Sequence, residues 1–432
     1  MTVSAQETGR NRILLVALLG GIQRCLAMLP PLLNRLVIAN AGMHAADQIA
    51  LVALPLAAVT LFSASPALVG ALVAAQGMAW LIVSLPGGIV VDRLGPSRLA
   101  RLAPWLSLAG LTLALLALRL ASPYLLGLAV FISATGTVLF VLALATLTPR
   151  LLPPTAFAKA NGRLELARAL VTLPAPTVIA WLIAHVSTNA AFIAALAAAA
   201  MAIIALSSMP RPPPSAQPPR HPIQDIREGL LFVWHQPILR GILGCALAWN
   251  AAFFALVAVF VPFALNIAQL SVQDIGLALS GQGVGLLLGA LTAGTIVTRF
   301  QPRFILILGP LSSVAGAALI FISAGQSAIY TAGAGYFLVG FCPMLWLVCQ
   351  TSLRQSVTPA ALLGRVNATI QLAIYGVRPL GALLGGAIAH RFGPGAALIL
   401  VIALFALSTI AAIVSDLGRL RTMPAAATEP LV

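Results

Sequence analysis

The sequence predicts an all-α integral membrane protein with 12 transmembrane helices in two six-helix bundles, related by a parallel pseudo-two-fold repeat. Three observations predict this fold class: the composition, the spacing of the apolar runs, and a repeat between the two halves of the chain. Of the 432 residues, 60% are hydrophobic and 8% are charged, whereas a soluble domain carries about 25% charged residues. This composition, with a mean hydropathy of +1.04, excludes a soluble enzyme, a disordered protein and a secreted disulfide scaffold.

Apolar runs follow one another along the chain, separated by short polar breaks. A run of about 20 apolar residues is enough to cross a bilayer. An even number of crossings places both termini on one side of the membrane. The expected spans are residues 35–62, 66–91, 99–119, 124–148, 164–185, 189–208, 238–265, 273–297, 303–322, 327–352, 367–389 and 394–415.

The distribution of basic residues predicts the orientation, because loops rich in Lys and Arg stay in the cytoplasm. If both termini and each loop after an even-numbered span are cytoplasmic, 21 of the 24 basic residues lie on that side. Only Arg119 and Arg391 lie opposite, and Arg378 lies within a span. We therefore expect a multi-pass protein of the inner (cytoplasmic) membrane. The basic residues are scattered singly, without an aromatic-flanked stripe, so nucleic acid is not an expected partner.

Two segments outside the spans complete the expected organisation. Residues 13–30 are apolar but contain Arg24; we expect an interfacial helix on the cytoplasmic face, with a start-site extension before Met28 as the alternative. Residues 209–222 are proline-rich and cannot form a helix, and residues 223–235 then alternate as a surface helix does. The expected domains are an N-terminal segment (1–31), a first bundle (32–208), a linker with an amphipathic helix (209–237), a second bundle (238–416) and a cytoplasmic tail (417–432).

An internal repeat appears when the sequence is shifted by 206 residues. The two halves have the same in–out sense, which is a parallel repeat. Such repeats are related by an axis along the membrane normal and place the substrate site at their interface. The shift pairs Gly70 with Gly276, Gln76 with Gln282, Gly77 with Gly283, Gly88 with Gly294, Arg93 with Arg299, Pro153 with Pro359 and Asn161 with Asn367.

The connection after span 2 carries a motif of the form G-x-x-x-D-R-x-G-x-x-R. The residues that fit it are Gly88, Asp92, Arg93, Gly95 and Arg98. With twelve spans and the repeat, this resembles the major facilitator superfamily over about residues 32–420; in the second half Thr298 replaces the acid. A carboxylate at a helix end can cap that end and pair with a guanidinium. The resemblance implies that Asp92 contacts the cytoplasmic start of span 11 and latches a gate. The alternative is that these charges only fix the topology.

Two further stretches narrow the resemblance: AKANGRLELARALVTLPAPTVIAWL after span 4 and LLGRVNATIQLAIYGVRPLGALLGGAIAHRFG after span 10. Both are similar to the drug:proton antiporter branch that contains macrolide efflux proteins and the enterobactin exporter. The antiporter pattern G-P-x-x-G-G in span 5 is reduced here to Ala175-Pro176-Thr177. The resemblance implies a secondary active transporter, without enzymatic activity or cofactor, that exports a small amphipathic drug or siderophore against protons.

Apart from Asp274 at the very start of span 273–297, two acidic residues fall within the expected spans, Asp47 and Glu165. A charge at the bilayer centre costs about 2.5–3.5 kcal/mol, so Asp47 should face a cavity or a partner. It shares a helix face with Asn40 and His44, and a carboxyl group in low dielectric can exchange its proton near neutral pH. We expect Asp47 to be the proton-coupling site, with His44 sharing the proton. The alternative is a hydrogen-bonded aspartate that braces span 1.

Glu165 lies between Arg163 and Arg168 at the cytoplasmic start of span 5. Since Glu165 and Arg168 are i, i+3 neighbours, they are expected to form an ion pair. We interpret these three residues as a gate or structural salt bridge rather than as a proton carrier.

Polar residues in other spans predict the lining of a cavity. In span 11, Gln371, Tyr375 and Arg378 follow one stripe, and Arg378 could bind an anionic group of a substrate or neutralise Asp47. Helix packing is the alternative role for each of these stripes. The expected cavity or substrate residues are Asn40, Gln76, Trp80, Asn250, Gln371, Tyr375 and Arg378.

Neither the Cys nor the His residues have the spacing of metal ligands, so no metal site is expected. No Walker motif is present, which excludes ATP as the direct energy source. The expected partners are a small-molecule substrate, protons and the lipid bilayer, for a monomer. The alternatives are a lysolipid or lipid flippase on the same fold, a facilitator without proton coupling, and a sensor without transport activity or a cavity.

Overall fold

The computed structural model describes residues 31–151, 157–207, 209, 222–323, 327–359 and 362–424. Within these ranges, 12 spans are long and apolar enough to cross a membrane, as predicted. The expected segments 13–30 and 210–221 lie outside the described residues. The helices are α2 (Pro31–Phe62), α3 (Pro66–Leu94), α4 (Pro96–Arg119), α5 (Pro123–Leu151), α6 (Phe157–Thr172), α7 (Ala175–His185), α8 (Thr188–Leu206), α9 (Pro222–His235), α10 (Pro237–Asn266), α11 (Val272–Arg299), α12 (Pro302–Phe321), α13 (Ala328–Val357), α14 (Leu363–Phe392) and α15 (Pro394–Val414).

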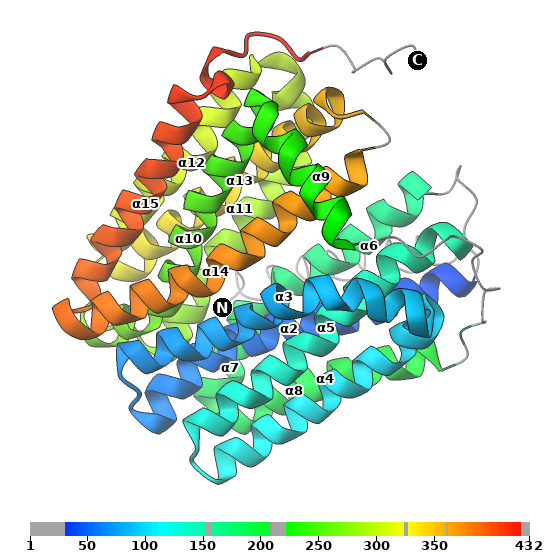
Figure 1. Ribbon diagram of the computed structural model, residues 1–432. Helices are drawn as coiled ribbons and strands as arrows, with labels where there is room; N and C mark the ends of the chain where they lie inside the picture. The colour runs from blue at the N-terminus through cyan, green and yellow to red at the C-terminus, as the bar shows by residue number, and fades with distance from the viewer. Residues whose placement is uncertain are drawn as a thin grey trace, which may run out of the picture.

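The helices form two bundles, α2–α8 and α10–α15, which meet at one end and diverge toward the other (Figure 1). In the first bundle α2 packs on α8, and α3 and α4 pack on α5. In the second bundle the corresponding partners are α10 with α15, and α11 and α12 with α13. The seams between the bundles correspond as well: α3 lies against α14, and α11 lies against α7. This equivalence of packing confirms the predicted two-fold repeat.

The 206-residue shift holds at the level of single contacts across these seams. A Cβ added at Gly70 would lie 2.6 Å from the carbonyl oxygen of Ala382, and one at Gly276 would lie 2.7 Å from that of Pro176. Ala382 and Pro176 are themselves separated by the shift. Glycine is therefore needed at both positions because the backbones of facing helices approach closely.

The expected span 164–185 is two helices, α6 and α7, interrupted at Leu173 and Pro174. Proline lacks the N–H that would continue the helix, and its ring clashes with the preceding turn. The corresponding helix of the second bundle, α14, continues without interruption past Pro379. The predicted span is present as Gly162–His185, and it is made of these two helices, α6 and α7.

The turn between α3 and α4 explains one glycine of the sequence motif. Gly95 has a φ of +78°, a conformation that glycine adopts without steric cost, and Pro96 begins the next helix directly after it. At the equivalent turn of the second half, Gln301 has a φ of −63°. The second-half turn needs no glycine, in agreement with the decay of the motif there.

The bundles share one apolar core at the end away from the basic loops and have separate cores at the other. The shared core joins Leu56, Val73 and Ala74 of the first bundle to residues of α10 and α14. We call the opposite end, where helix ends next to the α3–α4 and α13–α14 connections carry Arg93, Arg98, Arg354 and Arg365, the basic end. There the core of each bundle is its own, so the bundles are closed at one end and open at the basic end.

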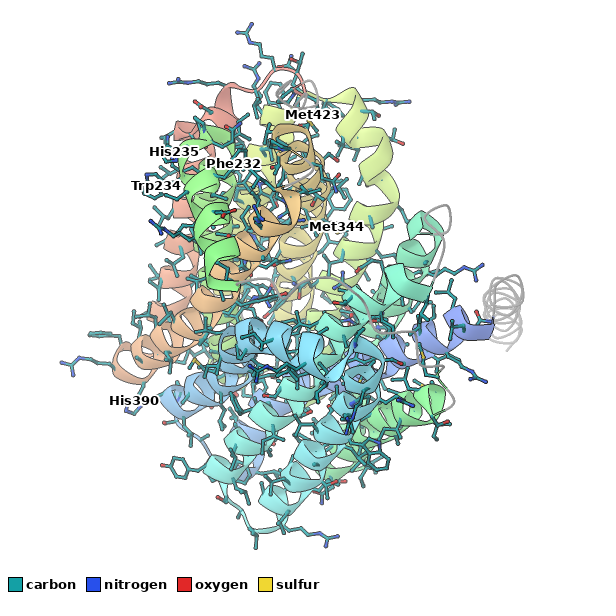
Figure 2. All side chains as sticks on the ribbon, turned by 45° about the vertical axis from the view of Figure 1, so that its right-hand side comes forward. Phe232, Trp234, His235, Met344, His390 and Met423 are labelled. Carbon is teal, nitrogen blue, oxygen red and sulfur yellow. The ribbon has the colours of Figure 1, made fainter. Side chains whose placement is uncertain are left out.

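Helix α9 occupies the expected position of the surface helix and packs on the first turns of α14. Glu228 forms an ion pair with Arg365 at 2.5 Å, and a Cβ at Gly229 would lie 2.5 Å from the Arg365 carbonyl oxygen. Trp234 is 63% exposed and lies on the outer side of α9 with His235 (Figure 2). Helix α9 of the linker is therefore attached to the first turns of α14, which lie at the open, basic end of the second bundle.

Candidate functional site

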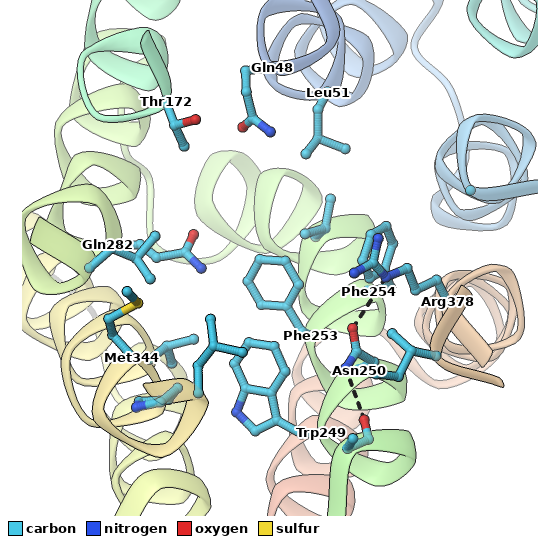
Figure 3. Close-up of a pocket in the computed structure, with 18 of the residues that line it drawn as sticks. Gln48, Leu51, Thr172, Trp249, Asn250, Phe253, Phe254, Gln282, Met344 and Arg378 are labelled. Atoms are coloured by element: carbon cyan, nitrogen blue, oxygen red, sulfur yellow. Dashed lines mark hydrogen bonds between the residues drawn. The ribbon is translucent and has the colours of Figure 1, made fainter. Parts of the chain in front are cut away.

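A cavity of about 650 Å³ lies between the two bundles (Figure 3). Ligand pockets in proteins typically enclose about 300–1,000 Å³, so the cavity can hold a small molecule. Gln48, Leu51 and Thr172 of the first bundle face Trp249 and Phe253 of the second across it. The sensor alternative predicted that the protein has no cavity, and the structure contradicts that prediction.

Asp47 lies at the middle of α2 and lines the cavity, as predicted. Its carboxyl Oδ1 accepts a hydrogen bond from Nε2 of Gln76 on α3 at 3.2 Å. Gln76 is only 4% exposed, which holds the carboxyl group between two helices of the first bundle. His44 also lines the cavity, but in the described structure it is not hydrogen-bonded to Asp47. Asp47 and His44 therefore line the same cavity, but no hydrogen bond connects them in the described structure.

Arg378 of α14 also lines the cavity and is held by groups of the second bundle. Its Nε donates to Oδ1 of Asn250 at 3.2 Å, and Nδ2 of Asn250 donates to the Ala246 carbonyl at 2.9 Å. The guanidinium carbon lies 4.8 Å from the ring centre of Tyr375 and 5.1 Å from that of Phe254, which are cation–π distances. Among the described carboxylates, Asp47 included, none lies within ion-pair distance of Arg378.

Aromatic rings form one wall of the cavity. Trp249 and Phe253 are stacked, with ring centres 5.2 Å apart and planes at 6°. Trp249 Nε1 donates to Oγ of Ser313 at 3.0 Å, which fixes the ring. Trp80 of α3 contacts Tyr375 of α14 at 4.9 Å, so aromatic contacts cross between the bundles. This wall offers flat apolar surface beside the buried guanidinium.

The prediction that Asn40 lines the cavity is wrong. Its side chain is 4% exposed, and Nδ2 donates to the carbonyl oxygen of Leu164 on α6 at 2.9 Å. Asn40 lies about two turns from Asp47 toward the basic end, where α6 covers the same helix face. The other predicted lining residues do face the cavity: Gln76, Trp80, Asn250, Gln371, Tyr375 and Arg378.

Glu165 and Arg168 form the predicted ion pair at 2.7 Å and line the cavity. Both side chains are largely exposed, so the pair contributes little to stability. Arg163, which was expected to join them, does not: its Nη1 is buried without a hydrogen-bond partner. Residues two apart on a helix point in different directions, which explains why Arg163 does not reach Glu165.

The gate motif is only partly visible. The side chain of Asp92 lies outside the described residues, so its contact with the start of α14 stays a prediction. Arg93 and Arg98 are exposed. A Cβ added at Gly88, or at Gly364 near the start of α14, would meet no atom within 4 Å. These parts of α3 and α14 are therefore not packed closely.

The cavity also contains polar residues that were not predicted. Gln282 is the repeat partner of Gln76, so the 206-residue shift was a signal that could have identified it. Gln350 and Arg354 of α13 line the cavity as well. Arg354 is one of the 21 basic residues that the orientation rule assigns to the cytoplasmic side, and that rule gave no sign of a position in the cavity. The described residues contain no cluster of His, Cys, Asp and Glu that could hold a metal ion.

Comparison with known proteins identifies related sequences and structures. The sequence profile described as Major Facilitator Superfamily matches residues 36–381. The enterobactin exporter EntS of Shigella flexneri is 29% identical over 166 residues, and that of Escherichia coli O1:K1 is 30% identical over 168 residues. Each match covers 38% of this chain and 38% of the relative, so well under half of the length of these exporters is matched.

Solved structures share the fold at lower identity. The nucleoside transporter NupG has a TM-score of 0.72 at 14% identity, over 88% of this chain and 97% of that one. A D-xylose-proton symporter has a TM-score of 0.70 at 17% identity, over 90% of this chain and 97% of that one. At such identities, the likeness concerns the twelve-helix fold alone.

Proposed function

Since the chain belongs to the Major Facilitator Superfamily, and is therefore a transport protein of the membrane rather than an enzyme, we propose that it exports a small amphipathic molecule in exchange for protons. The relatives named as enterobactin exporters support export, and of the two proposed substrate classes they support the siderophore. The cavity volume of about 650 Å³ suits a molecule of that size.

The observation that carries the proposal is the position of Asp47. It is the only acidic residue near the middle of a described span, and it lines the cavity. An ionised carboxylate is costly where the cavity closes around it, whereas the protonated form is not. Protonation of Asp47 therefore biases the equilibrium between the states in which the cavity opens to either side.

The arrangement of the bundles supports alternating access. The basic end is open and the opposite end is closed by the shared apolar core. By the positive-inside rule the basic end is cytoplasmic, and the structure then corresponds to the inward-facing state, which loads substrate from the cytoplasm. Rocking of the bundles along the α3–α14 and α7–α11 seams would produce the outward-facing state.

The test is a flux assay in proteoliposomes with enterobactin, a macrolide and a hydrophobic dye, with and without a pH gradient. We expect the gradient to drive flux of at least one of them in the wild type. Asp47→Asn should abolish the stimulation by the gradient. Asp416→Asn, which removes a carboxylate outside the spans and the cavity, is the matched control and should behave as the wild type.

Two results would contradict the proposal in different ways. Full gradient-driven flux in Asp47→Asn would remove the assigned role of this residue. Wild-type flux that ignores the gradient would leave a facilitator without proton coupling.

The proposed orientation in the inner membrane has its own test. With the C-terminus in the cytoplasm, a C-terminal green fluorescent protein fusion should fluoresce and a C-terminal alkaline phosphatase fusion should be inactive. The reverse pattern would invert the orientation and make the open end face outward.

A further inference from the structure

The two walls of the cavity carry opposite charges. On the wall from the first bundle, the lining acids are Asp47 and Glu165, and Glu165 is accompanied by Arg168. On the wall from the second bundle, the charged lining residues are Arg354 of α13 and Arg378 of α14, and no lining residue is acidic. The cavity is therefore electrically polarised, with its unbalanced positive charge on the second bundle.

Each acid has a direct partner, whereas the second-bundle guanidinium groups make no direct ion pair in the described chain. Asp47 accepts from Gln76 at 3.2 Å, and Glu165 pairs with Arg168 at 2.7 Å. In the described chain no carboxylate lies within 4 Å of Arg354 or Arg378. A guanidinium group inside the membrane that makes no direct ion pair is incompletely compensated, and an anionic ligand in contact with it would add to its stabilisation.

Arg378 is positioned to receive an anion attached to an aromatic ring. Its guanidinium lies over the rings of Tyr375 and Phe254, and Nε is oriented by Asn250. The stacked pair Trp249 and Phe253 stands beside it on α10 (Figure 3). A flat ring placed on that stack brings an acidic substituent to the guanidinium.

A second polar subsite lies on α13. Gln350 and Arg354 are four residues apart, on one helix face, and both line the cavity. Gln350 is 4% exposed, and its Oε1 has no hydrogen-bond partner. The amide orientation is defined because Nε2 donates to the Leu347 carbonyl at 3.3 Å and to Thr351 Oγ1 at 3.0 Å. The Nε of Arg354 is likewise buried without a partner, so an unused acceptor and an unused donor lie one turn apart.

We propose that the cavity selects aromatic anions, with the acidic group at Arg378, the ring on Trp249 and Phe253, and a second polar group at the Gln350–Arg354 subsite. The second group is one that donates to Gln350 and accepts from Arg354, as a carboxamide does. This assignment rests on the proposed transport function, because it treats the cavity as the substrate site. It adds the charge and chemical class of the substrate.

The test compares three probes with one ring and different charges: 2-naphthoate, 2-naphthamide and 2-naphthylmethylammonium. Binding to the purified full-length protein in detergent is measured by isothermal titration calorimetry. We expect 2-naphthoate to bind about tenfold more tightly than the amide, and the cation to bind most weakly. Arg378→Gln should weaken 2-naphthoate about tenfold and leave the amide within twofold. The matched control Arg119→Gln, at an exposed site outside the cavity, should change neither.

The second subsite is tested with 2-naphthoates that carry a carboxamide on a tether of one to three methylenes. At least one tether should bind more tightly than 2-naphthoate in the wild type. Gln350→Leu should remove that gain while leaving 2-naphthoate itself unchanged, which also shows that the variant is folded. The absence of any gain in the wild type would overturn the second subsite.

Other outcomes separate this inference from the transport proposal. Tighter binding of the cation or the amide, no binding of any probe, or an Arg378→Gln variant with wild-type affinity would each overturn anion selectivity. None of these results alters the flux assay with Asp47→Asn, in which the loss of proton coupling is read with other molecules. Conversely, gradient-independent flux would end the exporter proposal without changing the order of probe affinities.

Discussion

Gln76 of α3 donates from Nε2 to both Oδ1 and the main-chain carbonyl of Asp47, at 3.2 and 3.4 Å. One amide thus fixes the carboxyl group and the backbone of α2 at the same point. The Oε1 of Gln76 is buried and has no hydrogen-bond partner. Gln76 therefore ties α2 to α3 through its donor, while its acceptor remains unused in the described structure.

Replacing Gln76 by Leu should lower gradient-driven flux about tenfold. The substitution removes the donor that orients Asp47 but leaves Arg378 and its neighbours in place. Binding of 2-naphthoate should stay within twofold of the wild type, as measured by calorimetry. Gln371→Leu, also in the cavity lining but without contact to Asp47, is the control. Equal flux defects in both variants would show that Gln76 acts as general polar lining only.

Asn40→Ala should destabilise the protein without changing its ligand preference. The substitution removes the buried hydrogen bond that ties α2 to the Leu164 carbonyl of α6, which is worth about 0.5–1.5 kcal/mol. Thermal unfolding in detergent, followed by tryptophan fluorescence, should show a lower midpoint than the wild type. Asn266→Ala, at an exposed helix end, should leave the midpoint unchanged. An altered order of probe affinities in Asn40→Ala would instead place Asn40 at the ligand.

Gly70→Val should open the closed end of the cavity. A side chain at Gly70 would collide with Ala382 and with Gly386, whose Cα lies 2.8 Å from the added Cβ. A cysteine at position 282, in a cysteine-free background, should react faster with a membrane-impermeant maleimide added from the side opposite the basic end. Gly244→Val, where a Cβ would meet nothing within 4 Å, is the control. Unchanged labelling in a folded Gly70→Val protein would refute the steric closure.

Gly229→Val should detach the linker helix from the second bundle. The added side chain would displace α9 from the Arg365 backbone and break the ion pair of Glu228 with Arg365. Limited proteolysis should then cut within α9 several-fold faster than in the wild type. Glu228→Gln alone should have a small effect, since half-exposed ion pairs contribute about 0.2–1 kcal/mol. Comparable cleavage rates in the wild type and Gly229→Val would show that α9 is held by other contacts.

The membrane potential should drive transport of an anionic probe more strongly than that of a neutral one. Entry of a proton and exit of an anion both move positive charge inward, and each charge gains about 2.3 kcal/mol per 100 mV. A potassium diffusion potential, negative on the side of the basic end, should therefore raise 2-naphthoate export in proteoliposomes at zero pH gradient. Indifference to the potential would exclude net charge movement.

The sequence predicted the helices and their symmetry well because both follow from strong physical demands. Lipid requires long apolar helices, and close packing at the seams requires glycine at Gly70 and Gly276. The shift of 206 residues between these glycines then predicted the equivalence of the seams. The cavity position of Asp47 was also predictable, because an acidic side chain at the middle of the membrane is too costly to expose to lipid.

Other features depended on which neighbour covers a given helix face, which one sequence does not reveal. Asn40 shares the face of Asp47, yet α6 covers it. The position of Arg354 near a cytoplasmic loop already agreed with the positive-inside rule, so there was no reason in the sequence to expect it in the cavity lining. The helix break inside span 5 could not be predicted from Pro174 alone, because proline is tolerated in membrane helices whose neighbours satisfy the freed groups. Helices α2 and α10 indeed continue past Pro55 and Pro262.

The unequal build of the two equivalent helices has a mechanical consequence. Helix α14 is continuous from Leu363 to Phe392, so we expect it to tilt as one unit. Its counterpart is jointed between α6 and α7, and such an elbow can absorb the same tilt as a local bend. We therefore expect α14 to move as a rigid body, whereas α6 and α7 can change their mutual angle at the junction. Motion of one half against the other should consequently pivot about a line displaced from the symmetry axis.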